Sequence, residues 1–183
     1  MAEGADLPAR STRSDSFFIG AQDFEPFDVV YDSAFSYYSG SGQYIKPTWE
    51  MDWTGETPPG LNAHANTLYS AASAVFKVPH NLAGTALTAY LWHTPLQASC
   101  TYYWRTAYQV WAASGAVRYY GTYHSNYFTG TKVVDQAYRE LAASPVSLLA
   151  GDLVYYFVSE YNSSGTDRGR LLGVEFAYTG YAP

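Results

Sequence analysis

The sequence predicts an all-β fold, an antiparallel jelly roll or β-sandwich with an extended N-terminal arm. Three observations predict it. Apolar residues recur at every second position in most runs of the chain. Clusters of Gly, Pro, Asn and Ser separate these runs and are typical of turns. Aromatic residues make up 18% of the 183 residues and include nineteen Tyr, a residue that favours strands.

The N-terminal 23 residues differ from the rest of the chain. They are polar and mixed in charge, and Pro and Gly interrupt any regular period. We therefore expect residues 1–23 to form an anchoring arm and residues 24–183 to form one domain around a single core. The arm is expected to hold a partner protein through five side chains: Phe17, Phe18, Ile19, Arg10 and Arg13.

Strands follow one another from residue 24 onward. They are expected at residues 27–31, 44–51, 74–79, 85–93, 101–111, 117–125, 153–161 and 171–178. Residues 131–144 also fit one face of a short helix, but we favour a strand there. The stretch "NSSGTDRGR" is rich in turn residues, so the last two strands are expected to be antiparallel neighbours or near neighbours. Gly151 predicts a tight turn, and Gly173 predicts a bulge or close packing.

The period of two assigns a face to each side chain. Tyr102, Trp104, Tyr108 and Val110 share one face of a half-buried strand. In the last strand, Leu172, Val174, Phe176 and Tyr178 should share a face opposite Gly173, Glu175 and Ala177.

Large apolar groups also lie on both faces of some strands. Leu87, Ala89 and Leu91 alternate with Tyr90 and Trp92, whereas a two-layer sandwich buries only one face of each sheet. A homo-oligomer would cover the second face, and we favour this over a ligand site.

Composition argues against several classes of function. The net charge is −6 and the ten Lys and Arg are scattered, so we expect no nucleic-acid partner. No apolar stretch is long enough to cross a bilayer, and no secretory signal is visible, so we expect no membrane partner. Cys100 is the only cysteine, which favours assembly in a reducing cytosol.

No arrangement of residues predicts catalysis. His64, His80, His93 and His124 are far apart in the sequence, so we expect no metal and no cofactor. Cys100 beside His93 is better explained as a small buried apolar residue than as a nucleophile. A glycosidase would need two carboxylates flanking one bond, and the spacing of Asp52, Glu56, Glu160, Asp167 and Glu175 does not require such a pair. We expect no catalytic residues and no enzyme activity.

The segment "RYYGTYHSNYF" carries a further cluster of aromatic residues. Four tyrosines there could stack on sugar rings or pack at a subunit interface: Tyr119, Tyr120, Tyr123 and Tyr127.

The order of five phrases resembles a set of bacteriophage virion proteins whose jelly-roll domains occur on capsid decorations, head spikes and tail fibres. The phrases are "FFIGAQDFEP", "AVFKVPHNLAGTALTAYLWHTP", "TYYWRTAY", "GDLVYYFVSEY" and "RLLGVEFAY", and the likeness covers residues 17–178.

The resemblance implies a non-enzymatic virion structural protein, a capsid decoration or head spike anchored to the shell by its N-terminal arm. It also implies a homotrimer, with the major capsid protein or another virion protein as partner, assembled in the host cytoplasm and located in the virion. The alternative is a receptor-binding module of a tail or head fibre that binds host surface polysaccharide. A glycan-degrading enzyme is a third, less favoured class.

Overall fold

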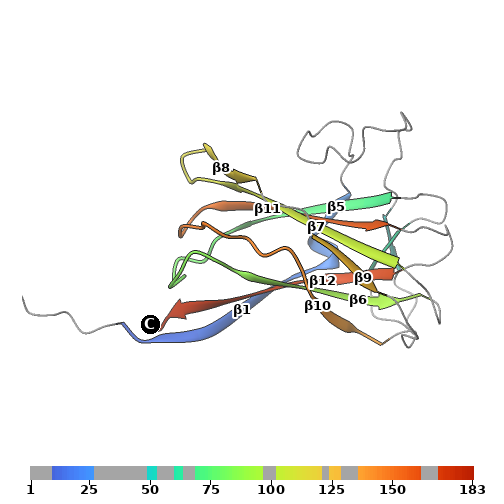
Figure 1. The fold of residues 1–183 in the computed structure, drawn as a ribbon, viewed down its shortest axis with the longest axis horizontal. Coiled ribbons are helices and arrows are strands. Elements are labelled where there is room, and N and C mark those ends of the chain that lie inside the picture. Colours follow the sequence, from blue (N-terminus) through green and yellow to red (C-terminus); the bar gives the residue numbers. More distant parts are fainter. Residues whose placement is uncertain are drawn as a thin grey trace, which may run out of the picture.

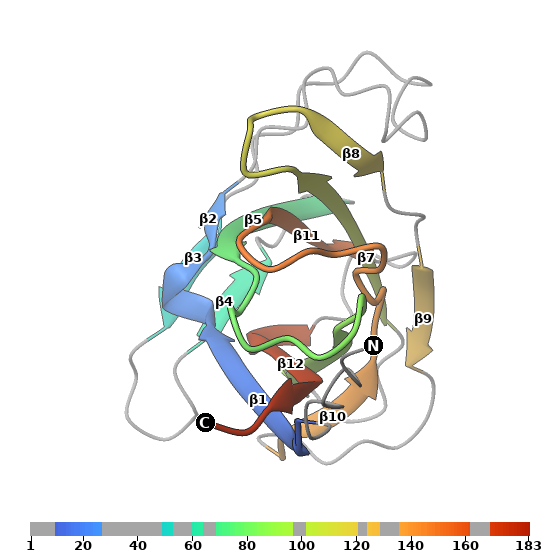
Figure 2. The same cartoon turned by 90° about the vertical axis from the view of Figure 1, so that its left-hand side faces the viewer.

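The computed structural model describes residues 10–26, 49–52, 60–63, 69–96, 102–120, 124–128, 136–161 and 169–183. These residues form two antiparallel six-stranded sheets that face each other, which confirms the predicted all-β sandwich (Figure 1). In the second view, β5 and β11 lie on the side opposite β12, β1 and β10 (Figure 2). No helix within the described ranges is both long and apolar enough to span a membrane.

The first sheet, sheet A, is built around the long strand β12 (Gly169–Tyr181). On one side β12 pairs with β6 (Thr88–Pro95), which pairs in turn with β10 (Tyr138–Leu141). On the other side the first part of β12 pairs with β4 (Gly60–Ala63), followed by β3 (Trp49–Asp52). The rest of that side pairs with β1 (Thr12–Gly20).

The second sheet, sheet B, has β11 (Leu153–Tyr161) at its centre. On one side β11 pairs with β5 (Tyr69–Lys77) and then β2 (Glu25–Pro26). On the other side it pairs with β7 (Tyr102–Trp111). Two short strands share the far edge of β7, namely β8 (Val117–Tyr120) and β9 (His124–Phe128).

The N-terminal segment belongs to the sandwich, so the boundary expected after residue 23 is wrong. Residues 12–20 pair with residues 173–181 over nine positions of β12. A single 3-10 turn, η1 (Ala21–Asp23), then carries the chain across to β2 in sheet B. The polar composition of this segment is that of an edge strand, because only one of its faces meets the core. Residues 1–9 lie outside the described part of the chain.

The core lies between the two sheets and follows the period of two. Side chains that are almost fully enclosed include Trp104, Tyr102, Tyr156, Phe176, Leu87 and Leu91. Tyr102, Trp104, Tyr108 and Val110 are all buried, as the alternation along β7 predicts. Burial of each such large side chain contributes roughly 1.5–3 kcal/mol, so these residues supply most of the driving force for sandwich formation.

A bulge in β12 changes the faces expected for its first residues. The register with β6 shifts between Leu171 and Gly173, as Gly173 predicted. Leu171 is therefore fully buried, whereas Leu172 is only half-buried, so the face expected for Leu172 is wrong. Beyond the bulge, Val174 and Phe176 are buried as expected.

The last two strands do not pair with each other. β11 lies in sheet B and β12 in sheet A, so the expected neighbours face each other across the core. Their rings meet there, since the Tyr156 and Phe176 centroids lie 5.0 Å apart, edge to face. The turn residues of "NSSGTDRGR" predict a loop between the two strands, but they do not show which sheet each strand joins.

Other strand expectations have mixed outcomes. The ambiguous segment 131–144 contains strand β10, as favoured, at residues 138–141. The strand expected at residues 27–31 lies outside the described residues.

Gly151 adopts φ +86° in the tight turn before β11, which confirms the turn expected at this glycine. The neighbouring Asp152 holds this turn, because its Oδ2 accepts the Leu149 N–H at 2.7 Å and lies 3.5 Å from Nε of Arg118.

Candidate binding faces

The five residues expected to anchor the arm separate onto two sides of β1. Phe17 points into the sandwich, where its ring centroid lies 5.2 Å from those of both Phe76 and Phe176. Ile19 is part of the same core. These two side chains therefore contact their own domain rather than a partner, contrary to the expectation. Phe18 points the other way and is 53% exposed.

The two arginines lie near the start of β1. Arg13 forms an exposed ion pair with Asp15 at 3.4 Å. The guanidinium carbon of Arg10 lies 5.8 Å from the centre of the Tyr181 ring. An exposed ion pair contributes little to stability, so both cations are still available to a partner.

Three of the four tyrosines of the predicted aromatic cluster lie on strands at one edge of sheet B. Tyr119 and Tyr120 are in β8 and Tyr127 is in β9, and both strands pair with β7. Tyr123 lies outside the described residues, as do the side chains of the other three. Their role in binding a glycan or another subunit stays a prediction.

The outer face of sheet A carries an ordered row of side chains. In register across strands β10, β6, β12 and β1, the row consists of Leu141, Tyr90, Glu175 and Phe18. The next row runs from Arg139 to Trp92 and ends in two glycines, Gly173 and Gly20. We call the six side chains Leu141, Tyr90, Glu175, Phe18, Arg139 and Trp92 the sheet A platform.

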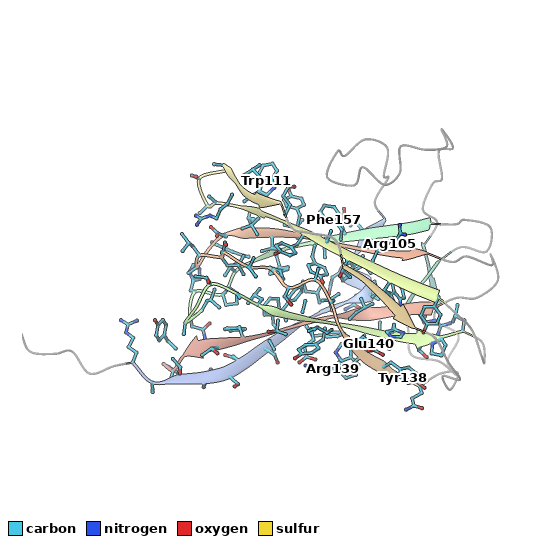
Figure 3. The ribbon with its side chains drawn as sticks, viewed as in Figure 1. Arg105, Trp111, Tyr138, Arg139, Glu140 and Phe157 are labelled. Atoms are coloured by element: carbon cyan, nitrogen blue, oxygen red, sulfur yellow. The ribbon has the colours of Figure 1, made fainter. Side chains whose placement is uncertain are left out.

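An ion pair lies at the centre of the platform. Arg139 donates from Nε to Oε2 of Glu175 at 2.8 Å and from Nη2 to Oε1 at 3.1 Å. The indole N–H of Trp92 donates to the same Oε2 at 3.0 Å. The side chains of Arg139 and Glu175 are 39% and 21% exposed. Three strands thus converge on one carboxylate that remains open to solvent; in Figure 3, Arg139 lies on the outside of the lower sheet.

Arg139 also covers the ring of Tyr90, with its guanidinium carbon 3.3 Å from the ring centre. This cation–π contact fixes the guanidinium plane. The hydrogen bonds from Arg139 lower the pKa of Glu175 below its usual value, against a smaller opposing effect of burial, and the bond from Trp92 adds to the lowering. Glu175 is therefore ionised over the neutral range, and the pair carries no net charge.

The outer face of sheet B carries a group of exposed and half-buried apolar side chains. Two register rows cross it, Val75 to Tyr155 to Gln109 in one and Leu153 to Trp111 to Val117 in the other. Val75 is 51% exposed, and Leu153 and Val117 are also exposed. The rings of Trp111 and Tyr155 are in contact, with centroids 5.7 Å apart. We call these five residues the sheet B patch; Figure 3 shows Trp111 on the outside of the upper sheet.

His93, the histidine considered beside Cys100, is fully buried between the sheets. Its Nδ1 and the Tyr102 hydroxyl form a 2.8 Å hydrogen bond, and its ring stacks on that of Tyr138 at 5.9 Å. Cys100 lies outside the described residues. No three His, Cys, Asp or Glu residues in the described ranges come together as metal ligands would. The structure thus places His93 in the packed core.

Sequence reasoning missed the sheet A platform as a unit. It placed Tyr90 and Trp92 on one face and noted Glu175 as a carboxylate, but it did not include Arg139. The alternation of Tyr90 and Trp92 with buried residues was the available signal. The register that brings Arg139 next to Trp92 depends on pairing between distant strands, which a single sequence does not display.

No family model matches the chain, and no curated protein matches it. Solved structures do resemble it. One is the CBM36-1 domain of a multidomain xylanase from the hindgut metagenome of Trinervitermes trinervoides, with TM-score 0.47 and 10% identity, covering 92% of this chain and 99% of that one.

Two further solved structures resemble the chain to a similar degree. A carbohydrate-binding module CBM36 in complex with calcium and xylotriose gives TM-score 0.43 and 13% identity, covering 87% of this chain and 98% of that one. The CBM22-1 xylan-binding domain of Paenibacillus barcinonensis Xyn10C gives 0.44 and 12%, covering 97% and 99%.

Proposed function

We propose that this chain is a non-enzymatic structural protein of a bacteriophage virion, a capsid decoration or head spike that self-associates through the sheet B patch. The resemblance of residues 17–178 to virion jelly-roll domains supports the virion location and a trimer. The observation that carries the self-association is the patch itself.

The patch is apolar and contiguous. Its five residues lie on four adjacent strands, with Gln109 in register with Tyr155 and Lys77 in register with Leu153 at its edges. Contiguous exposed apolar surface is rare on monomeric proteins and marks an interaction site. A closed oligomer covers the same patch on every copy, which makes a second copy of this chain the simplest partner.

The anchor to the particle consists, in this proposal, of residues 1–11 and the exposed side chain of Arg13. Residues 12–20 are committed to β12, and Phe17 and Ile19 to the core. In this proposal Arg10 and Arg13 bind the major capsid protein or another virion protein, together with residues 1–9. The start of β1 lies beside the C-terminus (Figure 1), and the Ala182 N–H donates to the Ser11 carbonyl at 3.0 Å.

Self-association is tested by sedimentation of the purified chain and two charge variants. Val75→Glu places a charge in the sheet B patch, whereas Thr88→Glu places the same charge at an exposed position of sheet A. We expect an oligomer for the wild type and Thr88→Glu and a monomer for Val75→Glu, all with the same far-ultraviolet circular dichroism. A monomeric wild type at micromolar concentration contradicts the proposal, as does an oligomeric Val75→Glu variant.

The virion location needs a separate test. An antibody against the purified chain should label intact phage particles made from the genome that encodes it. Particles that remain unlabelled while the chain accumulates in the lysate would contradict the location and leave the self-association standing.

A further inference from the structure

We propose that the sheet A platform binds a neutral oligosaccharide. The site lies on the opposite sheet from the sheet B patch, so it goes beyond the proposed structural role and does not depend on it. It also differs from the predicted aromatic cluster, of which Tyr119, Tyr120 and Tyr127 lie on strands of sheet B.

The charge of the platform selects for a neutral ligand. Arg139 and Glu175 neutralise each other in a two-bond pair. An acidic ligand would have to compete with Glu175 for Arg139, and a basic one with Arg139 for Glu175. Either exchange gives up a charge-assisted bidentate contact, which is among the stronger hydrogen-bonded pairs in proteins.

The hydrogen-bonding capacity of the pair selects for a ligand that carries hydroxyl groups. An ionised carboxylate offers about four acceptor positions, and Glu175 uses three of them for Arg139 and Trp92. The guanidinium has five N–H groups, of which two donate to Glu175, and Nη1 takes no part in that pair. A hydroxyl can donate to the remaining carboxylate position and accept from Nη1. An apolar protein surface can do neither, and covering a charged pair without new hydrogen bonds is costly.

The flanks of the platform supply apolar contacts on both sides of this polar centre. Phe18 is 53% exposed at one end of the row and Leu141 is 59% exposed at the other. They are separated by three strand spacings, or about 14 Å. A pyranose ring presents C–H groups on its faces and hydroxyl groups around its edge. A short sugar chain laid across the strands can therefore place C–H faces on Phe18 and Leu141 and hydroxyl groups on the Arg139–Glu175 pair.

The platform is already ordered without a ligand. Arg139 is held by two hydrogen bonds to Glu175 and by the ring of Tyr90. Phe18 is held against the backbone at Gly173. Binding thus immobilises few side chains, and the entropy lost on binding is small.

The test begins with the purified full-length chain on an array of neutral and acidic oligosaccharides. Titration calorimetry with the strongest neutral hexasaccharide then compares four proteins. Phe18→Ala removes an apolar flank, and Arg139→Lys keeps the charge but loses the two-bond geometry. Val75→Glu is the matched control, because it alters an exposed residue on the other sheet.

We expect binding to neutral glycans, and an affinity per site that falls by about tenfold or more in Phe18→Ala and Arg139→Lys, which is the effect of losing about 1.4 kcal/mol of contact. Val75→Glu should bind as the wild type does even if it is monomeric. Absence of binding to every neutral glycan, preference for acidic glycans, or unchanged affinity in both platform variants with native circular dichroism would each overturn the inference. A monomeric wild type that still binds through the platform would refute only the self-association.

Discussion

The ring of Phe18 lies over Gly173, in the space that any other side chain at position 173 would occupy. A Cβ built on Gly173 would overlap Cζ of Phe18 and the carbonyl oxygen of Ile19. Gly173 also has φ +153°, a conformation that other residues rarely adopt. The position of the Phe18 ring on the outer face therefore requires glycine at position 173.

Substitution of Gly173 by Ala should be much more damaging than the same change at Gly151. We expect Gly173→Ala to lower the free energy of unfolding by about 3 kcal/mol, because strain and overpacking both apply. Gly151 has φ +86°, but its Cβ would meet only side-chain atoms at 3.6 Å and beyond, so about 1–2 kcal/mol is expected. Urea unfolding measures both, and equal losses would contradict the close contact at Gly173.

Truncation of Phe17 should lower the stability of the domain far more than truncation of its neighbour Phe18. Phe17→Ala removes a ring that packs on Phe76 and Phe176, so we expect a loss of roughly 3 kcal/mol. Phe18→Ala removes an exposed ring and should cost about 0.5 kcal/mol or less. The melting temperatures of the two variants check this, and a similar fall in both would show that the faces of β1 are misassigned.

Two N-terminal deletions should separate the anchor from the fold. Deletion of residues 1–11 leaves β1 intact, so we expect a native circular dichroism spectrum and cooperative unfolding. Deletion of residues 1–23 removes β1 and exposes one edge of β12 together with the rings that Phe17 covers. We expect that product to be unfolded or aggregated. If it folds with wild-type stability, β1 is dispensable and the original boundary after residue 23 is functionally correct.

Acid should weaken the domain through Glu175. Its pKa is lowered in the folded state, mainly by the hydrogen bonds from Arg139. The unfolded state then takes up a proton first, so the stabilisation is complete above the unfolded pKa of about 4.3 and is lost as the pH falls through the folded pKa. Glu175→Gln should be less stable than the wild type at pH 7, and the difference should shrink toward pH 3. A difference that does not change with pH would show that the ion pair contributes nothing.

Alkaline pH should lower the stability of the domain because Tyr156 is buried in its neutral form. Burial raises the pKa of this tyrosine well above its usual value of about 10, and its hydroxyl donates to the Ala143 carbonyl at 2.8 Å. The stabilisation is complete below pH 10 and is lost as the pH rises toward the folded pKa. Tyr156→Phe should lower the free energy of unfolding by about 1 kcal/mol at pH 7. Above pH 10 its stability should fall less steeply with pH than that of the wild type. Chemical unfolding at several pH values measures both, with Tyr155→Phe, on the solvent side of the same strand, as control.

The sequence predicts which face of a strand most side chains occupy, but it does not predict which strands pair. Alternation along β7 assigns Tyr102 and Trp104 to the core because side-chain direction is a local property of a strand. Leu172 lies on the face opposite to the expected one, because the bulge next to Gly173 inserts one residue into β12. The period of two alone does not show where such a bulge occurs. The segment around Phe17 reads as an arm because half of its side chains face solvent. The Arg139–Glu175 pair depends on register between strands that are far apart in the chain, which local pattern does not encode.

The pairing of β1 with β12 has a consequence for the newly made chain. The first strand finds its partner only after about 160 further residues have been synthesised, which at 5–20 residues per second takes roughly 10–30 s. Throughout that interval Phe17 and Ile19 lack the surface that buries them, and the edge of β1 is open to other nascent chains. On the ribosome, this domain is therefore most vulnerable to misassembly at its N-terminus, and it becomes safe only when its last strand emerges.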